Sequence, residues 1–217
     1  MNPALTEEQV RAALVDAVRR LDSSGLNRGS TGNASHRWQD GMLITPTGMG
    51  AELGPDDLVF VHDDGTVHGP WQPSSEWAFH RAAYRVRPDM AAVLHTHAVH
   101  ATALGCLGRH LPAFHYMVAV AGGDDVPLVP YATFGSEALS MGVGQALAQR
   151  QACLLAQHGL VSGGSSLAQA MKVMQEIESL CQTYLLALAV GEPPVLPADE
   201  MARVLEKFRS YGRSARR

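Results

Sequence analysis

The spacing of apolar residues predicts helices at both ends of the chain and through its second half. Residues 6–21 place apolar side chains three and four positions apart, behind Thr6 and Gln9, a pair typical of an N-terminal capping box. Similar spacing predicts helices over 76–86, 136–150, 166–190 and 199–211. The helix over 166–190 carries an apolar stripe that we expect to pack in the core, formed by Val173, Met174, Ile177, Cys181, Tyr184, Leu185 and Leu188.

Shorter apolar runs between the helices predict strands. These runs cover 35–38, 42–45, 58–61, 66–68, 91–97 and 154–158. The sequence Asp63-Asp64-Gly65 separates two of them and is typical of a hairpin turn. Short strands joined by tight turns favour antiparallel pairing. We therefore expect an α/β chain of the α+β type, in which helices flank a central, mainly antiparallel sheet.

Length and composition indicate one domain without a membrane or nucleic-acid role. The chain has 217 residues, of which 46% are hydrophobic, so we expect a single domain over 1–217 with a mobile C-terminal tail over 207–217. A net charge of −4 argues against a dedicated nucleic-acid surface. The longest apolar segment, 180–190, is too short to span a bilayer, and residues 1–6 lack the pattern of a signal peptide. We expect a cytoplasmic protein.

The cysteines argue against a disulfide framework. There are three, they lie far apart, and each has apolar neighbours. We therefore expect reduced, buried thiols that bind no metal at Cys106, Cys153 and Cys181.

The run over 91–97 ends in His95-Thr96-His97, which is the first candidate for chemistry. Residues two apart in a strand project from the same face, about 6.5–7 Å apart, so both imidazoles are able to reach one metal ion. A His-x-His pair alone is a weak indicator in a chain with ten histidines. Its place at the end of a run that should be buried favours a ligand role, because a buried imidazole needs a partner. We expect His100 to lie behind this site or at the surface.

Two other segments offer a third ligand and a base. The run over 154–158 delivers His158 to a glycine turn, and Ser74, as a helix cap, precedes Glu76. Glu76 also has a structural explanation, because carboxylates stabilise the N-terminus of a helix. Beside a metal, it would ligate the resting ion and accept a proton once substrate displaces it. Three imidazoles and an open position favour catalytic zinc over a structural site.

Hydroxyls and glycines near these residues suggest a phosphate pocket. Ser74 and Ser75 precede free amides at the start of a helix, which is a favourable place for an anion. Residues 29–35 and 45–48 add more amides and hydroxyls. Each segment alone is a common turn. The chain contains neither a P-loop motif nor a strand-embedded Gly-x-Gly-x-x-Gly motif, so nucleotide binding is not predicted.

Taken together, motifs along almost the whole chain resemble the class II, zinc-dependent sugar-phosphate aldolases. The resemblance is carried by residues 25–27, 32–33, 40–48, 73–77, 95–100, 112–117, 130–135, 157–160 and 204–212. It implies one zinc ion per subunit on His95, His97 and His158, with Glu76 as resting ligand and catalytic acid/base. It also implies a phosphate pocket made by Gly32, Asn33, Thr47, Gly48, Ser74 and Ser75.

The resemblance further implies a homotetramer with active sites between subunits. Tyr116 of a neighbouring subunit would donate a proton to the aldehyde oxygen, and Tyr211 would close the site and orient the aldehyde. Without the resemblance, Tyr116 would be interpreted as an aromatic residue in an apolar strand. Phe134 and Phe208 would form the wall that contacts the aldehyde.

The reaction implied is reversible cleavage of L-fuculose 1-phosphate, or a similar deoxy-ketose 1-phosphate, to dihydroxyacetone phosphate and L-lactaldehyde or a similar aldehyde. Close alternatives are an aldolase for methylthioribulose or 5-deoxyribulose 1-phosphate, a pentulose-5-phosphate 4-epimerase and a methylthioribulose-1-phosphate dehydratase. A non-catalytic binding module is a further alternative. Such a module would be expected to lack the metal ligands or Glu76, and this chain has both.

Overall fold

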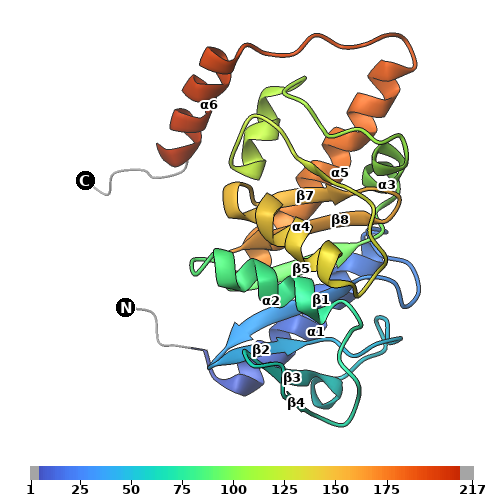
Figure 1. Ribbon diagram of the computed structural model, residues 1–217, viewed down its shortest axis with the longest axis vertical. Coiled ribbons are helices and arrows are strands. Elements are labelled where there is room, and N and C mark those ends of the chain that lie inside the picture. Colours follow the sequence, from blue (N-terminus) through green and yellow to red (C-terminus); the bar gives the residue numbers. More distant parts are fainter. Residues whose placement is uncertain (1–4, 211–217) are drawn as a thin grey trace.

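The computed structural model describes residues 5–210 and is built around one eight-stranded sheet (Figure 1). The strand order is β4-β3-β2-β1-β5-β8-β7-β6. The strands are β1 (Asn33–Trp38), β2 (Gly41–Ile44), β3 (Val59–His62), β4 (Val67–His68), β5 (Ala92–Thr96), β6 (Leu128–Val129), β7 (Ala152–Leu155) and β8 (Gly159–Gly164). Neighbouring strands of this sheet are antiparallel except β6 and β7, which run parallel. The predicted mainly antiparallel sheet is confirmed.

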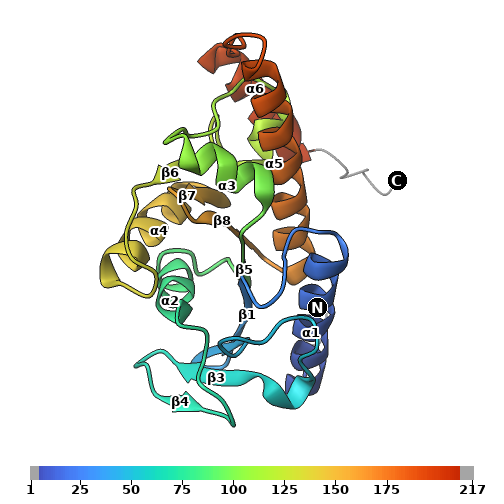
Figure 2. The ribbon, with the colours of Figure 1, turned by 90° about the vertical axis from the view of Figure 1, so that its right-hand side faces the viewer.

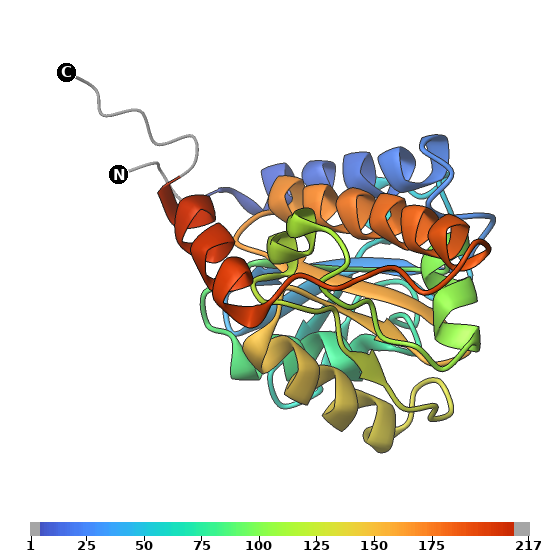
Figure 3. The ribbon, with the colours of Figure 1, turned by 90° about the horizontal axis from the view of Figure 1, so that it is seen from above.

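Helices cover both faces of the sheet, as Figures 2 and 3 show. The helices α1 (Glu7–Ser23), α3 (Val99–Cys106) and α5 (Leu167–Leu188) pack on one face, and α2 (Trp77–Val86) and α4 (Glu137–Gln149) pack on the other. The remaining helical segments are η1 (Pro55–Asp57), η2 (Tyr116–Ala121) and α6 (Ala198–Ser210). Each face therefore has its own cluster of buried apolar side chains, with the sheet between them.

The ends of the main helices follow from local sequence. Thr6 caps α1, and its hydroxyl and the Gln9 side chain each accept a backbone N–H of the other residue, as the predicted capping box requires. Ser136 and Ser166 cap α4 and α5 in the same position. Five residues of the predicted stripe on α5 are buried and two are partly buried against the same cluster, which confirms the stripe.

Two adjacent strands, β5 and β8, place both histidine segments close together, at the end of β5 and just before the start of β8. β3 and β4 form the predicted hairpin, with Gly65 at a φ of 96° in the turn, a backbone conformation that favours glycine. β5 ends at Thr96, so His97 is the first residue beyond the strand. His158 lies in the tight turn between β7 and β8.

The expected burial of Cys106 is wrong, and so is the alternative interpretation of Tyr116 as a strand residue. Tyr116 begins the 3₁₀ helix η2 rather than lying in a strand, and its residue surface is 51% exposed. Cys153 and Cys181 are buried as expected, but Cys106 is exposed at the end of α3. Apolar residues are spread around α3 with no clear stripe, so its sequence gives no indication of which face turns toward solvent.

The C-terminal part of the chain is helical as far as the structure describes it. Residues 207–210 of the expected mobile tail form the last turn of α6, whereas Tyr211 and residues 212–217 lie outside the described residues. Within residues 5–210, no helix combines the length and the apolar character needed to cross a bilayer.

Candidate metal centre and active site

Three histidine rings meet where β5 ends. The ring centroids of His95 and His97 are 5.1 Å apart, those of His95 and His158 are 4.8 Å apart, and those of His97 and His158 are 5.0 Å apart. One ring nitrogen of each lies within 4.8 Å of the other two. Pairing of Thr96 with Leu160 between β5 and β8 brings the turn that carries His158 beside the end of β5. The predicted three-histidine cluster is therefore formed by the sheet itself.

The surroundings of His95 keep its ring neutral and leave Nε2 available to a metal ion. Its Nδ1 lies 3.0 Å from the carbonyl oxygen of Leu160, so Nδ1 carries the proton and Nε2 keeps its lone pair. Burial lowers the pKa of His95 to about 3 and also lowers the pKa of His97. Imidazoles bind metal ions in the neutral form, which these two residues hold at neutral pH.

Glu76 directs its carboxylate at this cluster. Its Oε2 lies 3.3 Å from His95 Nε2 and its Oε1 lies 3.2 Å from His158 Nε2. Burial raises the pKa of this carboxyl group, but the nearby His158, His95 and Asn33 together outweigh burial and lower the pKa to about 2. Glu76 is therefore ionised at neutral pH.

The start of α2 differs by one residue from the expectation. The helix begins at Trp77, and Glu76 stands at its N-cap position with non-helical dihedral angles (φ −103°, ψ 7°). Ser74 is not the cap residue, although its Oγ accepts the backbone N–H of Glu76 at 3.3 Å. Because Glu76 lies outside the helix, its side chain is free to turn toward the histidines.

The donor atoms at this cluster fit a divalent metal ion. Glu76 Oε1 and His95 Nε2 are buried and have no hydrogen-bond partner among the described residues. A buried polar atom without a partner costs about 1–3 kcal/mol, and coordination to a cation would remove that cost. Three imidazole nitrogens and one carboxylate, without a thiolate, are typical of catalytic rather than structural zinc sites.

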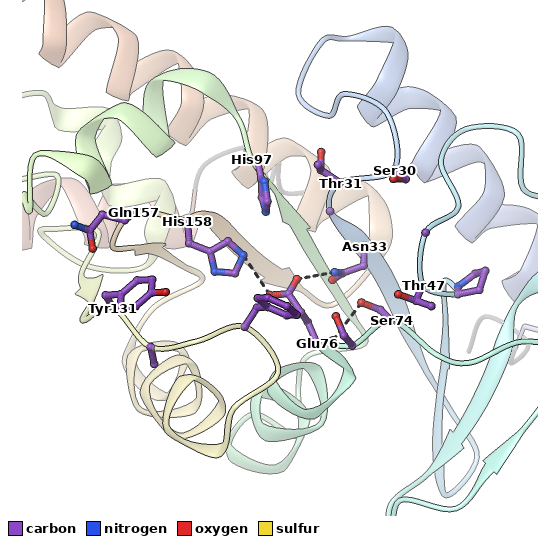
Figure 4. Close-up of a pocket in the computed structure, with 16 residues that line it drawn as sticks. Ser30, Thr31, Asn33, Thr47, Ser74, Glu76, His97, Tyr131, Gln157 and His158 are labelled. Carbon is purple, nitrogen blue, oxygen red and sulfur yellow. Dashed lines mark hydrogen bonds and ion pairs between the residues drawn. The ribbon is translucent and has the colours of Figure 1, made fainter.

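A cavity of about 330 Å³ lies beside Glu76. Figure 4 shows how the residues that line it are arranged. All the residues predicted to bind phosphate line it: Gly32, Asn33, Thr47, Gly48, Ser74 and Ser75. Glu76, His97 and His158 line it too, whereas His95 is fully buried next to them. The candidate metal ligands and the candidate phosphate residues therefore share one pocket.

Backbone contacts hold the polar segments around this pocket. The Thr47 amide donates to the carbonyl of Gln72 at 3.1 Å, and the Ser74 amide donates to the carbonyl of Thr45 at 3.0 Å, so segments 45–47 and 72–74 lie side by side. Gly32 has a φ of 74°, and a Cβ there would lie 2.5 Å from the carbonyl oxygen of His95. Only glycine allows this loop to approach the histidine strand so closely.

Several other residues are placed differently from expectation or were not predicted. Tyr131 and Gln157 line the cavity on the side away from Ser30 and Thr47 (Figure 4). Both lie within motifs of the family resemblance, over 130–135 and 157–160, but neither was assigned a role there. Phe134 lines the cavity as expected, whereas Phe208 packs against the core on the α5 face. The cavity lining also omits His100, which pairs with Glu178 at 2.8 Å, and Tyr116.

One buried histidine was not predicted to have any role near the site. His80 lies within α2, and its Nε2 is 2.5 Å from Oδ1 of Asn33. Asn33 in turn donates from Nδ2 to Glu76 Oε2 at 2.9 Å. The sequence offers one indication, the four-residue spacing of Glu76 and His80, which places both on one face of a helix.

Comparisons with known proteins agree with this geometry. Residues 12–185 match the family described as the class II aldolase and adducin N-terminal domain. The chain is 51% identical over 207 residues to the 5-methylthioribulose-1-phosphate/5-deoxyribulose-1-phosphate aldolase of Rhodospirillum rubrum, covering 95% of this chain and 94% of that protein. It is 49% identical over 201 residues to the L-fuculose phosphate aldolase of Escherichia coli K12, covering 92% and 94%.

A solved structure of an L-fuculose 1-phosphate aldolase superposes with a TM-score of 0.90 at 38% identity, covering 95% of this chain and 98% of that one. The shared fold extends over nearly the full length of both chains. The chain therefore belongs to the class II aldolase family and is an aldolase, which places its activity among the lyases.

Proposed function

We propose that this aldolase uses zinc to cleave a deoxy-ketose 1-phosphate reversibly to dihydroxyacetone phosphate and a short aldehyde. The observation that carries the proposal is the ionised carboxylate of Glu76, which faces three clustered histidines in a pocket lined by hydroxyls. In this assignment, His95, His97 and His158 would hold one zinc ion and Glu76 would be its resting ligand. A bound zinc ion supplies a positive charge that polarises the substrate carbonyl and stabilises negative charge on its oxygens.

Glu76 would move the proton of the reaction. In the condensation direction, its carboxylate would take the proton from the hydroxyl-bearing carbon of dihydroxyacetone phosphate. In cleavage, the same group returns that proton to carbon. The fixed hydrogen bond from Asn33 to Oε2 supports this role, because it keeps the carboxylate oriented between the cavity and the histidines.

The phosphate would bind at the end of the pocket formed by Gly32, Asn33, Thr47, Gly48, Ser74 and Ser75. In the described part of the chain, the lining of the cavity contains no lysine or arginine. Hydroxyls, backbone amides and the N-terminus of α2 would therefore hold the phosphate. The aldehyde portion would lie toward Tyr131 and Phe134, whose rings suit an apolar chain end.

The end of the pocket near Tyr131 and Phe134 would decide which deoxy-ketose 1-phosphate is preferred. L-Fuculose 1-phosphate is our first candidate. The R. rubrum relative supports 5-methylthioribulose or 5-deoxyribulose 1-phosphate as a second candidate, because its identity to this chain is as high. These substrates share the phosphate end and differ in the aldehyde that cleavage releases.

Several earlier expectations stay predictions alongside this proposal. They are a single domain over 1–217, a cytoplasmic location and a homotetramer with active sites between subunits. Tyr116 of a neighbouring subunit would protonate the aldehyde oxygen, and Tyr211 would close the site. The exposure of Tyr116, outside the cavity of its own chain, supports a role in another subunit.

A coupled assay for dihydroxyacetone phosphate tests the proposal. L-Fuculose, 5-deoxyribulose and 5-methylthioribulose 1-phosphates are each given to native, chelator-stripped and zinc-restored protein. We expect release that stripping abolishes and zinc restores, a loss of at least about a hundredfold in Glu76→Gln, and wild-type rates in the surface control Glu8→Gln. No release from any of the three, with a pentulose 5-phosphate epimerised or a methylthio-ketose dehydrated instead, would overturn the aldol assignment.

A further inference from the structure

Five polar side chains form a continuous buried line between β1 and α2. Glu76, at the N-cap position of α2, is four residues from His80, which is four residues from Tyr84, and Asn33 and Ser35 are two apart on β1. Four residues of helix rise about 6 Å, and two residues of strand rise about 6.6 Å. Because these repeats nearly match, side chains from the two elements alternate along the line. The proposed function uses only Glu76 and Asn33.

Short hydrogen bonds connect every step of this line. Asn33 Nδ2 donates to Glu76 Oε2 at 2.9 Å, and His80 Nε2 lies 2.5 Å from Asn33 Oδ1. Ser35 Oγ lies 2.7 Å from His80 Nδ1 and 2.8 Å from the hydroxyl of Tyr84. Asn33, Ser35, His80 and Tyr84 are each at most 7% exposed, so water does not compete for these bonds.

The donor and acceptor properties of these groups determine which atom donates in each hydrogen bond along the line. The Glu76 carboxylate only accepts, so Asn33 must present its NH₂ group to Glu76 and its carbonyl oxygen to His80. That oxygen also only accepts, so His80 carries its proton on Nε2. Burial lowers the pKa of His80 to about 3, so its Nδ1 carries no proton at neutral pH and accepts the Ser35 hydroxyl.

We propose that His80 is a positioning residue that acts on Glu76 through Asn33. Its Nε2–H holds the Asn33 amide in the one orientation that donates to Oε2, which keeps Oε1 beside His158. Without this donor, the amide is able to flip and to place its carbonyl oxygen against the carboxylate. Two acceptors repel each other, so Glu76 turns away from its working position. The inference rests on the proposed function, in which Glu76 moves the substrate proton.

The first test needs no catalysis. Full-length protein labelled with ¹⁵N-histidine is studied by NMR at pH 7, and the His80 ring nitrogens are assigned as the signals that disappear in His80→Gln. We expect a protonated Nε2 and an unprotonated Nδ1 in the wild type. A ring protonated on Nδ1 alone, or on both nitrogens, would overturn the inference. If the protein cleaves no ketose phosphate, the proposed function fails while this spectrum still decides the direction of the line.

The second test separates positioning from packing. His80→Phe keeps a flat ring without the donor, His80→Gln restores an N–H donor, and Tyr84→Phe removes only the far end of the line. We expect kcat to fall at least about tenfold in His80→Phe, with KM and bound zinc within about threefold of wild type. His80→Gln should recover most of that loss, and Tyr84→Phe should stay within about twofold. A folded His80→Phe with wild-type kcat, or an equal loss in His80→Gln, would contradict the proposed role.

Discussion

Gly159, the first residue of β8, offers the sharpest test of how the fold builds the histidine cluster. A Cβ at this position would lie 2.3 Å from the carbonyl oxygen of Thr96 and 3.2 Å from a ring carbon of both His95 and His97. Ordinary contacts between such atoms are about 3.5 Å, so the Gly159→Ala variant must move the turn away from β5 by about 1 Å. That movement carries His158 away from the other two rings.

The expected cost follows from this displacement. Crowding of this size in a packed interior costs about 1–3 kcal/mol of unfolding free energy. Metal sites tolerate errors of only about 0.2 Å in ligand distance, and disturbing the support of one ligand weakens binding about 10–100-fold. We therefore expect a folded but destabilised Gly159→Ala protein whose zinc affinity is lower by about that factor.

The assay is competition for zinc between the protein and a coloured chelator, with urea denaturation as the measure of folding. Gly191→Ala is the matched control, because a Cβ at Gly191 would meet no atom within 4 Å and the residue does not have a positive φ. This control should match the wild type in both measurements. If Gly159→Ala stays folded and binds zinc as tightly as the wild type, the geometry described for the cluster is wrong.

Three further outcomes are expected. Zinc added to the stripped protein at 100 times its dissociation constant should raise the free energy of unfolding by about 2.7 kcal/mol, whereas an equal stability of both forms would argue against a bound ion. A maleimide should label only Cys106 in the folded protein, because burial shields both Cys153 and Cys181 and raises the pKa of the Cys153 thiol to about 12. Fast labelling of all three cysteines would refute this burial pattern. In metal-free protein, His80 and His95 are neutral when folded, with pKa values lowered to about 3, and take up protons when unfolded below about pH 6.5. The stability contributed by these two neutral histidines should therefore be fully present above pH 6.5, and it should fall by up to about 1.4 kcal/mol per pH unit for each histidine as pH drops. Between pH 6 and 5, the free energy of unfolding of His80→Gln should fall less steeply with pH than that of the wild type, by one such contribution. Equal slopes in the two proteins would contradict the buried, neutral state of His80.

The sequence predicts the histidine cluster because local periodicity determines much of it. His95 and His97 follow from a buried strand and its alternation, and Glu76 follows from its place at the start of a helix. The convergence of His158 on the same point depends on the pairing of β5 with β8, which joins residues more than sixty positions apart. Periodicity does not determine such a pairing. It identifies His158 as a candidate third ligand at the end of a second buried run, but not that this run lies beside β5.

Other features escaped prediction for identifiable reasons. His80 sits in the middle of α2, where a histidine gives no sign of its partner until β1 is packed against the helix. The parallel pairing of β6 with β7 spans only two residues, and no turn motif in the sequence indicates it. The exposure of Cys106 depends on which side of α3, a helix without a clear apolar stripe, faces solvent, and tertiary packing decides that.

Exchange of the carbon-bound proton of dihydroxyacetone phosphate with deuterium oxide tests the central claim most directly. It would report the proton transfer proposed for Glu76 without any aldehyde, so it does not depend on which ketose phosphate is the substrate. We predict that the zinc-loaded wild type exchanges one hydrogen at the hydroxyl-bearing carbon, that Glu76→Gln slows this exchange at least about a hundredfold, and that stripped protein regains it only with metal. Exchange that persists at the wild-type rate in Glu76→Gln, or in fully stripped protein, would contradict the assignment of Glu76 and the three histidines.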